Sequence, residues 1–206
     1  MSSYHVTSLD ELDRIPVSHG LEWRPIRRRL GIRAFGINAY TAEKVGDCVV
    51  EEHTEEQLGH EEVYVVVSGR ARFTLGDEVI DAPAGTLVYI GNPETTRVAI
   101  AEEPGTTVLA VGGAPGKVFE PSPWEWFFAA AGKEPEEAIA IMEDGLTECG
   151  EYPALLYHLA RYESQAGRAD EAAAHLQRAI ELRPDLREHA EQDGDLKGLL
   201  PIAGEP

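Results

Sequence analysis

Two histidines and a glutamate stand close together in the first third of the 206-residue chain, at His53, His60 and Glu62. Two imidazoles and one carboxylate form a ligand set that is known for protein-bound iron. These three residues are therefore our candidate metal ligands. An alternative stays open, in which His60 and Glu62 are polar residues at the rim of the domain, hydrogen-bonded to each other or to Tyr64.

The sequence around these residues resembles the two cupin motifs. Glu62 lies seven residues before Gly69, as at the end of the first motif, and Pro83-Ala-Gly85 precedes Asn92 by seven residues, as in the second. The resemblance covers about residues 30–115. It implies a small antiparallel β-barrel of the jelly-roll kind.

The resemblance implies less about chemistry, because the ligand pattern is incomplete. Metal-binding cupins typically use two histidines and a glutamate from the first motif and one histidine from the second. Val88 stands where the last histidine belongs, and Leu58 or Gln57 stands where the second one does. We therefore expect either a divalent metal (iron, manganese, nickel or zinc) on His53, His60 and Glu62, or no tightly bound metal. Residues Tyr64, Val88 and Asn92 are the expected lining of a ligand pocket.

Apolar and polar residues alternate from Ile32 to about Val111, which predicts short strands separated by Gly, Pro and Asn turns. Both alternate sets of Glu62–Ser68 are largely apolar, so we expect both faces of that strand to be buried. One set lines the barrel. The other set, Val63, Val65 and Val67, needs a second sheet, a helix or another subunit to cover it, and cupins commonly pair as homodimers.

The hydrophobic period becomes helical after a linker at 112–116. If Pro184 ends a repeat, the chain resembles tetratricopeptide units. The matching residues are Leu156, Leu159, Ala160, Gly167, Ala172, Leu176 and Ala179, with Trp126, Ala138, Met142 and Gly145 in a degenerate first repeat. Two such repeats bury little surface, so we expect them to lean on the barrel or on a second subunit.

The predicted organisation is a β plus α chain. It has an N-terminal arm (1–30), a cupin β-barrel (31–115), a helical segment that resembles tetratricopeptide repeats (117–200) and a frayed tail (201–206). Trp124 and Trp126 are two apart on a short helix and point to different sides. One of them is a candidate for a partner surface, although core packing competes as an explanation for both.

Five arginines fall between Arg24 and Arg33, in a chain of net charge −19. The first interpretation is a solvated surface paired with the protein's own carboxylates. An anion site or a self-complementary interface is the alternative.

The net charge of −19 argues against nucleic acid and anionic membranes as partners. Cys48 and Cys149 are too few for a disulfide framework, so the cytoplasm is the expected location. The abundance of arginine, alanine and glycine hints at a bacterial source.

We predict a non-catalytic, homodimeric small-ligand-binding or sensor module whose helices contact a protein partner. The alternative is a metal-dependent oxygenase or isomerase that acts on a small molecule through His53, His60 and Glu62.

Overall fold

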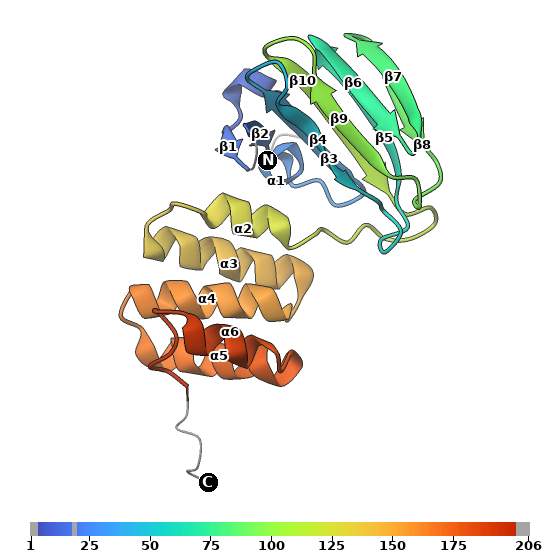
Figure 1. Ribbon diagram of the computed structural model, residues 1–206. Coiled ribbons are helices and arrows are strands. Elements are labelled where there is room, and N and C mark those ends of the chain that lie inside the picture. Colours follow the sequence, from blue (N-terminus) through green and yellow to red (C-terminus); the bar gives the residue numbers. More distant parts are fainter. Residues whose placement is uncertain (1–3, 18–19, 201–206) are drawn as a thin grey trace. The chain divides into compact units, whose positions relative to one another are not determined.

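A computed structural model describes residues 4–17 and 20–200, and the chain divides into two compact units (Figure 1). The first unit extends to Glu120 and the second begins at Pro121. The expected frayed tail, 201–206, lies outside the described residues.

The described residues of the first unit form ten strands, a 3₁₀ turn η1 (Leu9–Glu11) and a short helix α1 (Ile26–Leu30). The strands are β1 (Ile15–Pro16), β2 (Leu21–Arg24), β3 (Gly36–Ala42), β4 (Cys48–His53), β5 (Glu61–Ser68), β6 (Arg70–Leu75), β7 (Glu78–Pro83), β8 (Leu87–Ile90), β9 (Arg97–Ala101) and β10 (Thr106–Gly113). They form a six-stranded sheet in the order β1-β2-β3-β10-β5-β8 and a four-stranded sheet in the order β4-β9-β6-β7.

The two sheets are open, whereas we predicted a closed barrel. Among the described residues, strands β1, β8, β4 and β7 each pair on one side only, so neither sheet closes on itself or joins the other. Residues from both sheets meet in one buried apolar cluster, which includes Val49, Tyr64, Phe73 and Val108. The arrangement is therefore a two-layer sandwich, in which side chains rather than hydrogen bonds hold the layers together.

The N-terminal segment that we predicted as an arm contributes β1 and β2 to the six-stranded sheet. Its arginines are not all solvated, because Arg24 and Arg27 are 4% and 3% exposed. The Arg24 side chain donates to the Leu9 carbonyl at 2.7 Å, and Arg27 donates to the Ile32 carbonyl at 3.4 Å. The solvated-surface interpretation is thus wrong for these two residues, which are buried and hydrogen-bonded to the backbone.

Strand β5 buries one face and leaves the other partly open. Tyr64 and Val66 are buried in the sandwich core, as their alternation predicts, but Val67 on the opposite face is 46% exposed. On the same outer face of the neighbouring edge strand, Leu87 and Tyr89 are 68% and 63% exposed. The prediction that both faces of this strand are buried is therefore wrong for the single chain.

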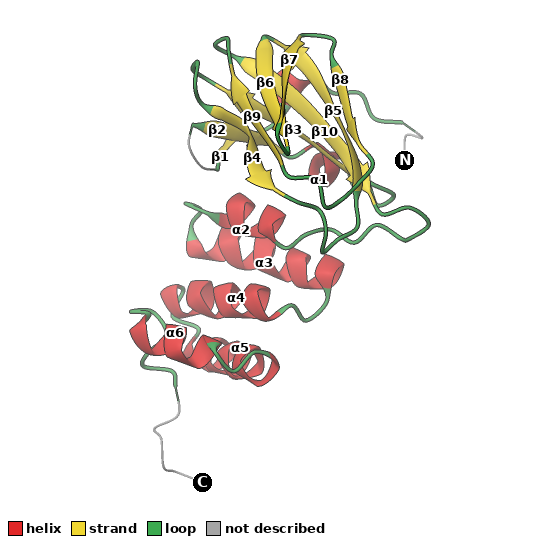
Figure 2. Ribbon diagram, turned by 45° about the vertical axis from the view of Figure 1, so that its right-hand side comes forward, coloured by secondary structure: helices red, strands yellow, loops and turns green. Residues whose placement is uncertain are grey.

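From Pro121 to residue 200, the regular structure of the second unit is helical (Figure 2). Its helices are α2 (Trp124–Ala130), α3 (Pro135–Cys149), α4 (Pro153–Gln165), α5 (Ala169–Leu182) and α6 (Leu186–Gln192). Helix α4 packs against both α3 and α5. The apolar positions that we predicted on α4 and α5 are at most 3% exposed: Leu156, Leu159, Ala160, Ala172, Leu176 and Ala179.

Trp126 is part of the helical core and is 1% exposed, so it is not a partner surface. Its indole nitrogen donates to Asp144 at 2.8 Å. Trp124 is half-buried and its ring lies 6.0 Å from that of Phe128. Within residues 4–17 and 20–200, no helix is both long enough and apolar enough to cross a membrane.

Candidate functional site

The candidate site lies on the inner face of the six-stranded sheet, where polar residues interrupt the apolar core. Glu62 and Tyr64 are two apart on β5 and therefore share this face. Glu62 is paired across the sheet with Gly112 and Ile90, and Tyr64 with Ala110 and Val88. Gly112 leaves room for the carboxylate, because a Cβ there would come within 2.8 Å of the Glu62 Cγ atom.

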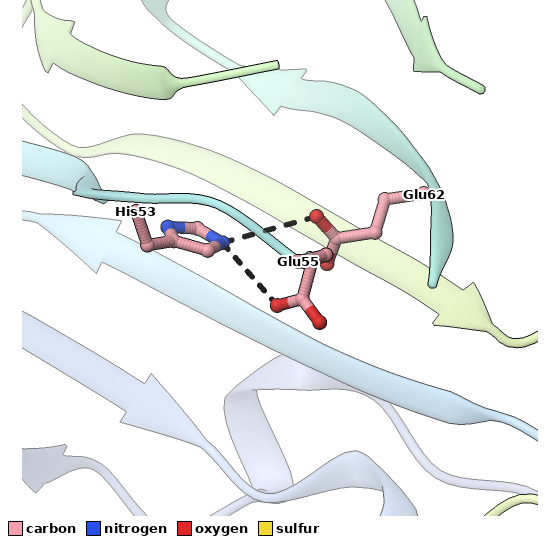
Figure 3. Close-up of side chains that lie close together, drawn as sticks. All are labelled: His53, Glu55 and Glu62. Carbon is pink, nitrogen blue, oxygen red and sulfur yellow. Dashed lines mark ion pairs between the residues drawn. The ribbon is translucent and has the colours of Figure 1, made fainter. Parts of the chain in front are cut away.

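A histidine and two glutamates converge at this point (Figure 3). The Nε2 atom of His53, at the end of β4, lies 3.6 Å from Glu55 Oε1 and 3.8 Å from Glu62 Oε2. One potential ligand atom from each residue lies within 4.8 Å of the other two. Strand β4, the loop after it and strand β5 therefore each contribute one side chain.

The predicted ligand set is corrected at one position, because Glu55 rather than His60 completes the three-residue group. Strand β5 begins at Glu61, so His60 precedes the strand and its side chain is not placed by strand alternation. His60 instead places Nδ1 at 3.1 Å from Glu55 Oε2, and its ring stacks on Phe119 with centroids 5.9 Å apart. It supports the cluster from outside the group.

The loop between β4 and β5 is held so that Glu55 reaches the cluster. Its backbone N–H donates to the Pro93 carbonyl at 2.9 Å, and its carbonyl accepts from Gly59 at 2.7 Å. The sequence analysis missed Glu55 because it lies in an acidic stretch with no strand periodicity. The turn at Gly59, which has φ +67°, is the conformation that brings this loop back toward β5.

The backbone fixes the orientation of the His53 ring. Nδ1 lies 2.7 Å from the Glu51 carbonyl oxygen, which can only accept, so Nδ1 carries a proton. Nε2 then faces two carboxylates. Burial alone lowers the pKa of His53, but Glu62 and the Glu51 carbonyl outweigh burial, and the pKa is raised. The imidazolium form, or a cation on Nε2, suits this position.

The two carboxyl groups have opposite pKa shifts. Burial followed by repulsion from Glu62 raises the pKa of Glu55, against the attraction of His60 and His53. Burial also acts to raise the pKa of Glu62, but hydrogen bonding from His53 and Tyr64 and the charge of Arg97 lower it. Glu62 is therefore the ionised member, and Glu55 takes up a proton more readily than an ordinary glutamate.

Tyr64, which we predicted to line a ligand pocket, is part of the cluster. Its hydroxyl donates to Glu62 Oε2 at 2.6 Å, and burial together with the Glu62 charge raises its pKa. It therefore stays protonated and acts as a hydrogen-bond donor. Val88 is 6% exposed and pairs with Tyr64 across the sheet, so it packs beside the cluster. Asn92 is exposed, and its side-chain oxygen accepts from the Glu94 N–H at 3.1 Å, which shapes a turn.

Arg97 is a second residue that the sequence analysis missed. It lies on β9 opposite His53, is 0% exposed, and places Nε 3.6 Å from Glu62 Oε2. The alternation of β9 could have revealed it, because Arg97, Ala99 and Ala101 are two residues apart and lie on the buried face of the strand. A charged residue at an inward strand position points to a partner inside the domain.

The donor types at the cluster fit a divalent metal such as zinc, iron or manganese. One imidazole nitrogen and two carboxylate oxygens are suitable ligands, and a backbone carbonyl on the second imidazole nitrogen is a common support for a metal-bound histidine. The Arg97 guanidinium stands beside the Glu62 oxygen that a metal would use, and its charge opposes a cation there.

Comparison with known proteins finds similarity of fold only. No family model and no curated protein matches the chain. KdgF from Halomonas sp. is 18% identical and its similarity covers 54% of this chain and 93% of its own, with a TM-score of 0.44. A cupin protein from Bacteroides fragilis is 20% identical over 59% of this chain and 93% of its own, with a TM-score of 0.42.

A sugar phosphate isomerase of the cupin superfamily from Silicibacter pomeroyi is 16% identical over 53% of this chain and 75% of its own, with a TM-score of 0.45. The Bacteroides fragilis protein and the isomerase are cupins, and the isomerase is an enzyme. At such identities and TM-scores, their activities do not transfer to this chain. The class that the fold and site define is a two-sheet β-sandwich with a polar cluster in its core, followed by a helical unit.

Proposed function

We propose that the β-sandwich unit is a small-ligand-binding or sensor module of the cupin kind, and that the polar cluster is its binding site. One observation carries the proposal: five polar or charged side chains converge beside the apolar core, and all of them except the partly exposed His53 are largely buried. They are His53, Glu55, Glu62, Tyr64 and Arg97. Burying so many polar groups costs stability, which makes binding a better explanation for them than packing.

The helical unit is the proposed contact with a protein partner, in the manner of tetratricopeptide repeats. Helices α4 and α5 form a hairpin around Gly167, and the positions that match the repeat pattern are buried between them. Half-buried Trp124 stays a candidate for the partner surface, as do Tyr152 and Leu182, which are 43% and 40% exposed. A protein that binds a ligand in its sandwich unit and a protein partner through its helical unit could act as a sensor.

We also propose that the chain forms a homodimer through the outer face of the six-stranded sheet. Strand β8 is an edge strand, and Leu87 and Tyr89 on it continue the apolar row of Val63, Val65 and Val67. An exposed apolar patch beside a free strand edge is a typical association surface.

A metal-dependent enzyme is the second candidate function, favoured by the compact ligand group of His53, Glu55 and Glu62. In that case these three residues would hold the metal, which would polarise a bound substrate, and Tyr64 would donate a hydrogen bond beside it. The proposed binding module needs no metal, because His53 in its charged form and Arg97 balance the two carboxylates.

Metal analysis of purified protein discriminates the two functions. For the binding module, we expect much less than one equivalent of metal per chain after dialysis against zinc, iron, manganese or nickel. Stoichiometric metal that is lost in both Glu55→Gln and Glu62→Gln, but kept in the exposed control Glu78→Gln, would establish the metal site instead. His60→Ala is an informative fourth variant, because the structure places His60 outside the ligand group.

Ligand binding itself is tested by recording protein NMR spectra against a panel of small acids, sugars and nucleosides. We expect at least one compound to shift the NMR signals of His53, Tyr64 and Val88. Signals of the helical unit should change little, unless ligand binding is transmitted to that unit. A panel that shifts only surface residues would count against a site in the core.

A further inference from the structure

Arg97 is a buried cation whose hydrogen bonds are unmade. Its side chain is 0% exposed, and none of its three guanidinium nitrogens forms a hydrogen bond with any residue in 4–17 or 20–200. Most buried polar groups in proteins are paired. The Glu62 carboxylate offsets the charge of Arg97, but the guanidinium N–H donors have no hydrogen-bond acceptor among the described residues. An acceptor from outside the chain would satisfy these donors.

Glu62 does not supply that acceptor. Its Oε2 atom lies 3.6 Å from Arg97 Nε, which is beyond a good hydrogen bond, and the same oxygen accepts the Tyr64 hydroxyl at 2.6 Å. The contact therefore provides charge attraction on one side of the guanidinium. The outer nitrogens, Nη1 and Nη2, are left with their donors unused.

The other open hydrogen-bonding position is on Glu55. Its Oε2 atom is buried and accepts no hydrogen bond within the described part of the chain, because the His60 Nδ1 atom 3.1 Å away is not aligned for one. The cluster thus presents unused donors on Arg97 and an unused acceptor on Glu55. A ligand that satisfies both carries an acceptor group and a hydroxyl group.

Small residues and one aromatic ring border this part of the inner face. Gly36 and Gly112 are paired across β3 and β10, and Gly112 is paired in turn with Glu62. A Cβ at Gly36 would lie 3.1 Å from the ring of Phe119, so this ring lies over Gly36, and it also stacks on His60. On this side, a ligand beside Glu62 would therefore meet backbone and an aromatic ring.

We propose that Arg97 binds the carboxylate of a small hydroxy acid, with a ligand hydroxyl donating to Glu55. A planar guanidinium matches a carboxylate in two parallel hydrogen bonds. The nearby carboxylates Glu55 and Glu62 favour a singly charged ligand over a dianionic phosphate. This inference rests on the proposed function, since it names the ligand class of that same site.

The test uses three probes on the full chain at matched ionic strength: D-glycerate, glycerol and inorganic phosphate. Thermal unfolding and titration calorimetry report binding. We expect glycerate to bind and to raise the melting temperature with concentration, glycerol to bind much more weakly, and phosphate to have no effect beyond that of sodium chloride. Phosphate binding tighter than glycerate would overturn the assignment to a carboxylate.

Variants locate the binding on Arg97. We expect Arg97→Gln to weaken glycerate at least about tenfold, the scale of one lost charged hydrogen-bond pair. Arg97→Lys should restore only part of the affinity, because a lysine lacks the fork. Arg72→Gln is the matched control, since Arg72 is an exposed arginine of the same unit that pairs with Glu102. It should bind glycerate as the native chain does.

Two outcomes separate the inference from the proposed function. Equal affinity for glycerol and glycerate, with no loss in Arg97→Gln, contradicts the acid assignment but leaves a small-ligand site standing. No binding of any probe, and no shift of the Arg97 side-chain NMR signal in the native chain, contradicts both. If Arg97→Gln does not fold, the NMR signal of the Arg97 side chain still tests the inference, because it is recorded on the native chain.

Discussion

Glu62 is the residue on which the cluster depends, because three other side chains direct charge or hydrogen bonds at it. Tyr64 donates to its Oε2 atom, and His53 and Arg97 place nitrogens 3.8 Å and 3.6 Å from the same oxygen. Tyr64 stays protonated and Glu62 ionised, so their hydrogen bond is charge-assisted. His53 and Arg97 are held in place by this one carboxylate.

The first prediction separates a ligand-binding arginine from a structural one. We expect Arg97→Met to change the free energy of unfolding by no more than about 1 kcal/mol, or to stabilise the free protein, because it removes an unsatisfied buried charge. Breaking a structural ion pair costs about 3–5 kcal/mol. Urea unfolding of the free protein measures the change.

Glu62→Gln is the companion variant for this measurement. Here we expect a larger loss of stability than for Arg97→Met, since His53 and Arg97 would then lack their shared carboxylate. The reverse ranking of the two variants would show that Arg97 is a structural partner of Glu62 and has no role in binding.

The second prediction concerns His158 on α4. Burial, and then the charge of Arg161, lowers its pKa to about 4, against the attraction of Asp193. The centroid of its ring lies 4.8 Å from the ring centroid of Phe127 and 5.9 Å from that of Tyr157. The unfolded chain takes up a proton near pH 6.5, whereas the folded chain resists it. Stability is therefore complete above about pH 6.5 and falls toward pH 4, by about 2 kcal/mol for this residue.

Unfolding free energies measured between pH 7 and pH 4 check this prediction. His158→Gln should have a shallower pH dependence than the native chain, and the exposed control His189→Gln should have the native slope. A His158→Gln slope equal to the native one would show that folding does not lower the pKa of His158.

At the scale of elements, the strands were predictable because period-two alternation and turn residues are local signals. The expected strand over Glu62–Ser68 is present and begins one residue earlier, at Glu61. Whether two sheets close into a barrel is not determined by local sequence signals. It depends on pairing between distant strands, and β4 meets β9 with register shifts that no sequence pattern marked.

The site was partly predictable for the same reason. His53, Glu62 and Tyr64 lie in or at the end of strands whose alternation places them, and the structure brings these three together. Glu55 and His60 lie in a loop, where the backbone path decides which side chain points inward. The cupin resemblance favoured histidines at this point, and the loop instead delivers Glu55.

The third prediction tests packing between helices. Gly145 of α3 has no room for a side chain, because a Cβ there would lie 2.9 Å from Trp126 Cγ and 3.0 Å from Leu155 Cδ2. Alanine favours a helix over glycine by about 1 kcal/mol, but overpacking costs about 1–3 kcal/mol. We therefore expect Gly145→Ala to destabilise the helical unit despite the better propensity.

Thermal unfolding followed by circular dichroism at 222 nm measures this change. Glu143→Ala is the control, since Glu143 is an exposed position on the same helix, and it should stay within about 0.5 kcal/mol of the native chain. Stabilisation by Gly145→Ala would mean that α2 and α4 shift to accommodate a methyl group.

At the scale of the whole molecule, the clusters of buried apolar residues belong to one unit or the other. Two of them are built from residues before Glu120 and two from residues after Pro121. The sandwich unit holds the polar cluster of the proposed ligand site, and the helical unit carries the surface proposed for a protein partner.

The last prediction is the dimer. We expect the native chain to sediment at twice the mass of one chain, because association would cover Val67, Leu87 and Tyr89, which are 46%, 68% and 63% exposed. The net charge of −19 on each chain opposes association, so raising the salt concentration should strengthen the dimer. Analytical ultracentrifugation over a concentration series measures both effects.

Substitution on the edge strand tests which face is used. The double variant Leu87→Lys with Tyr89→Lys should sediment as a monomer and keep its fold, because both side chains already face outward. Val79→Lys is the matched control: Val79 is 61% exposed but lies on β7 of the other sheet, so its variant should remain dimeric. A native chain that is monomeric at every concentration would contradict the dimer. A dimer broken by Val79→Lys alone would move the interface to the four-stranded sheet.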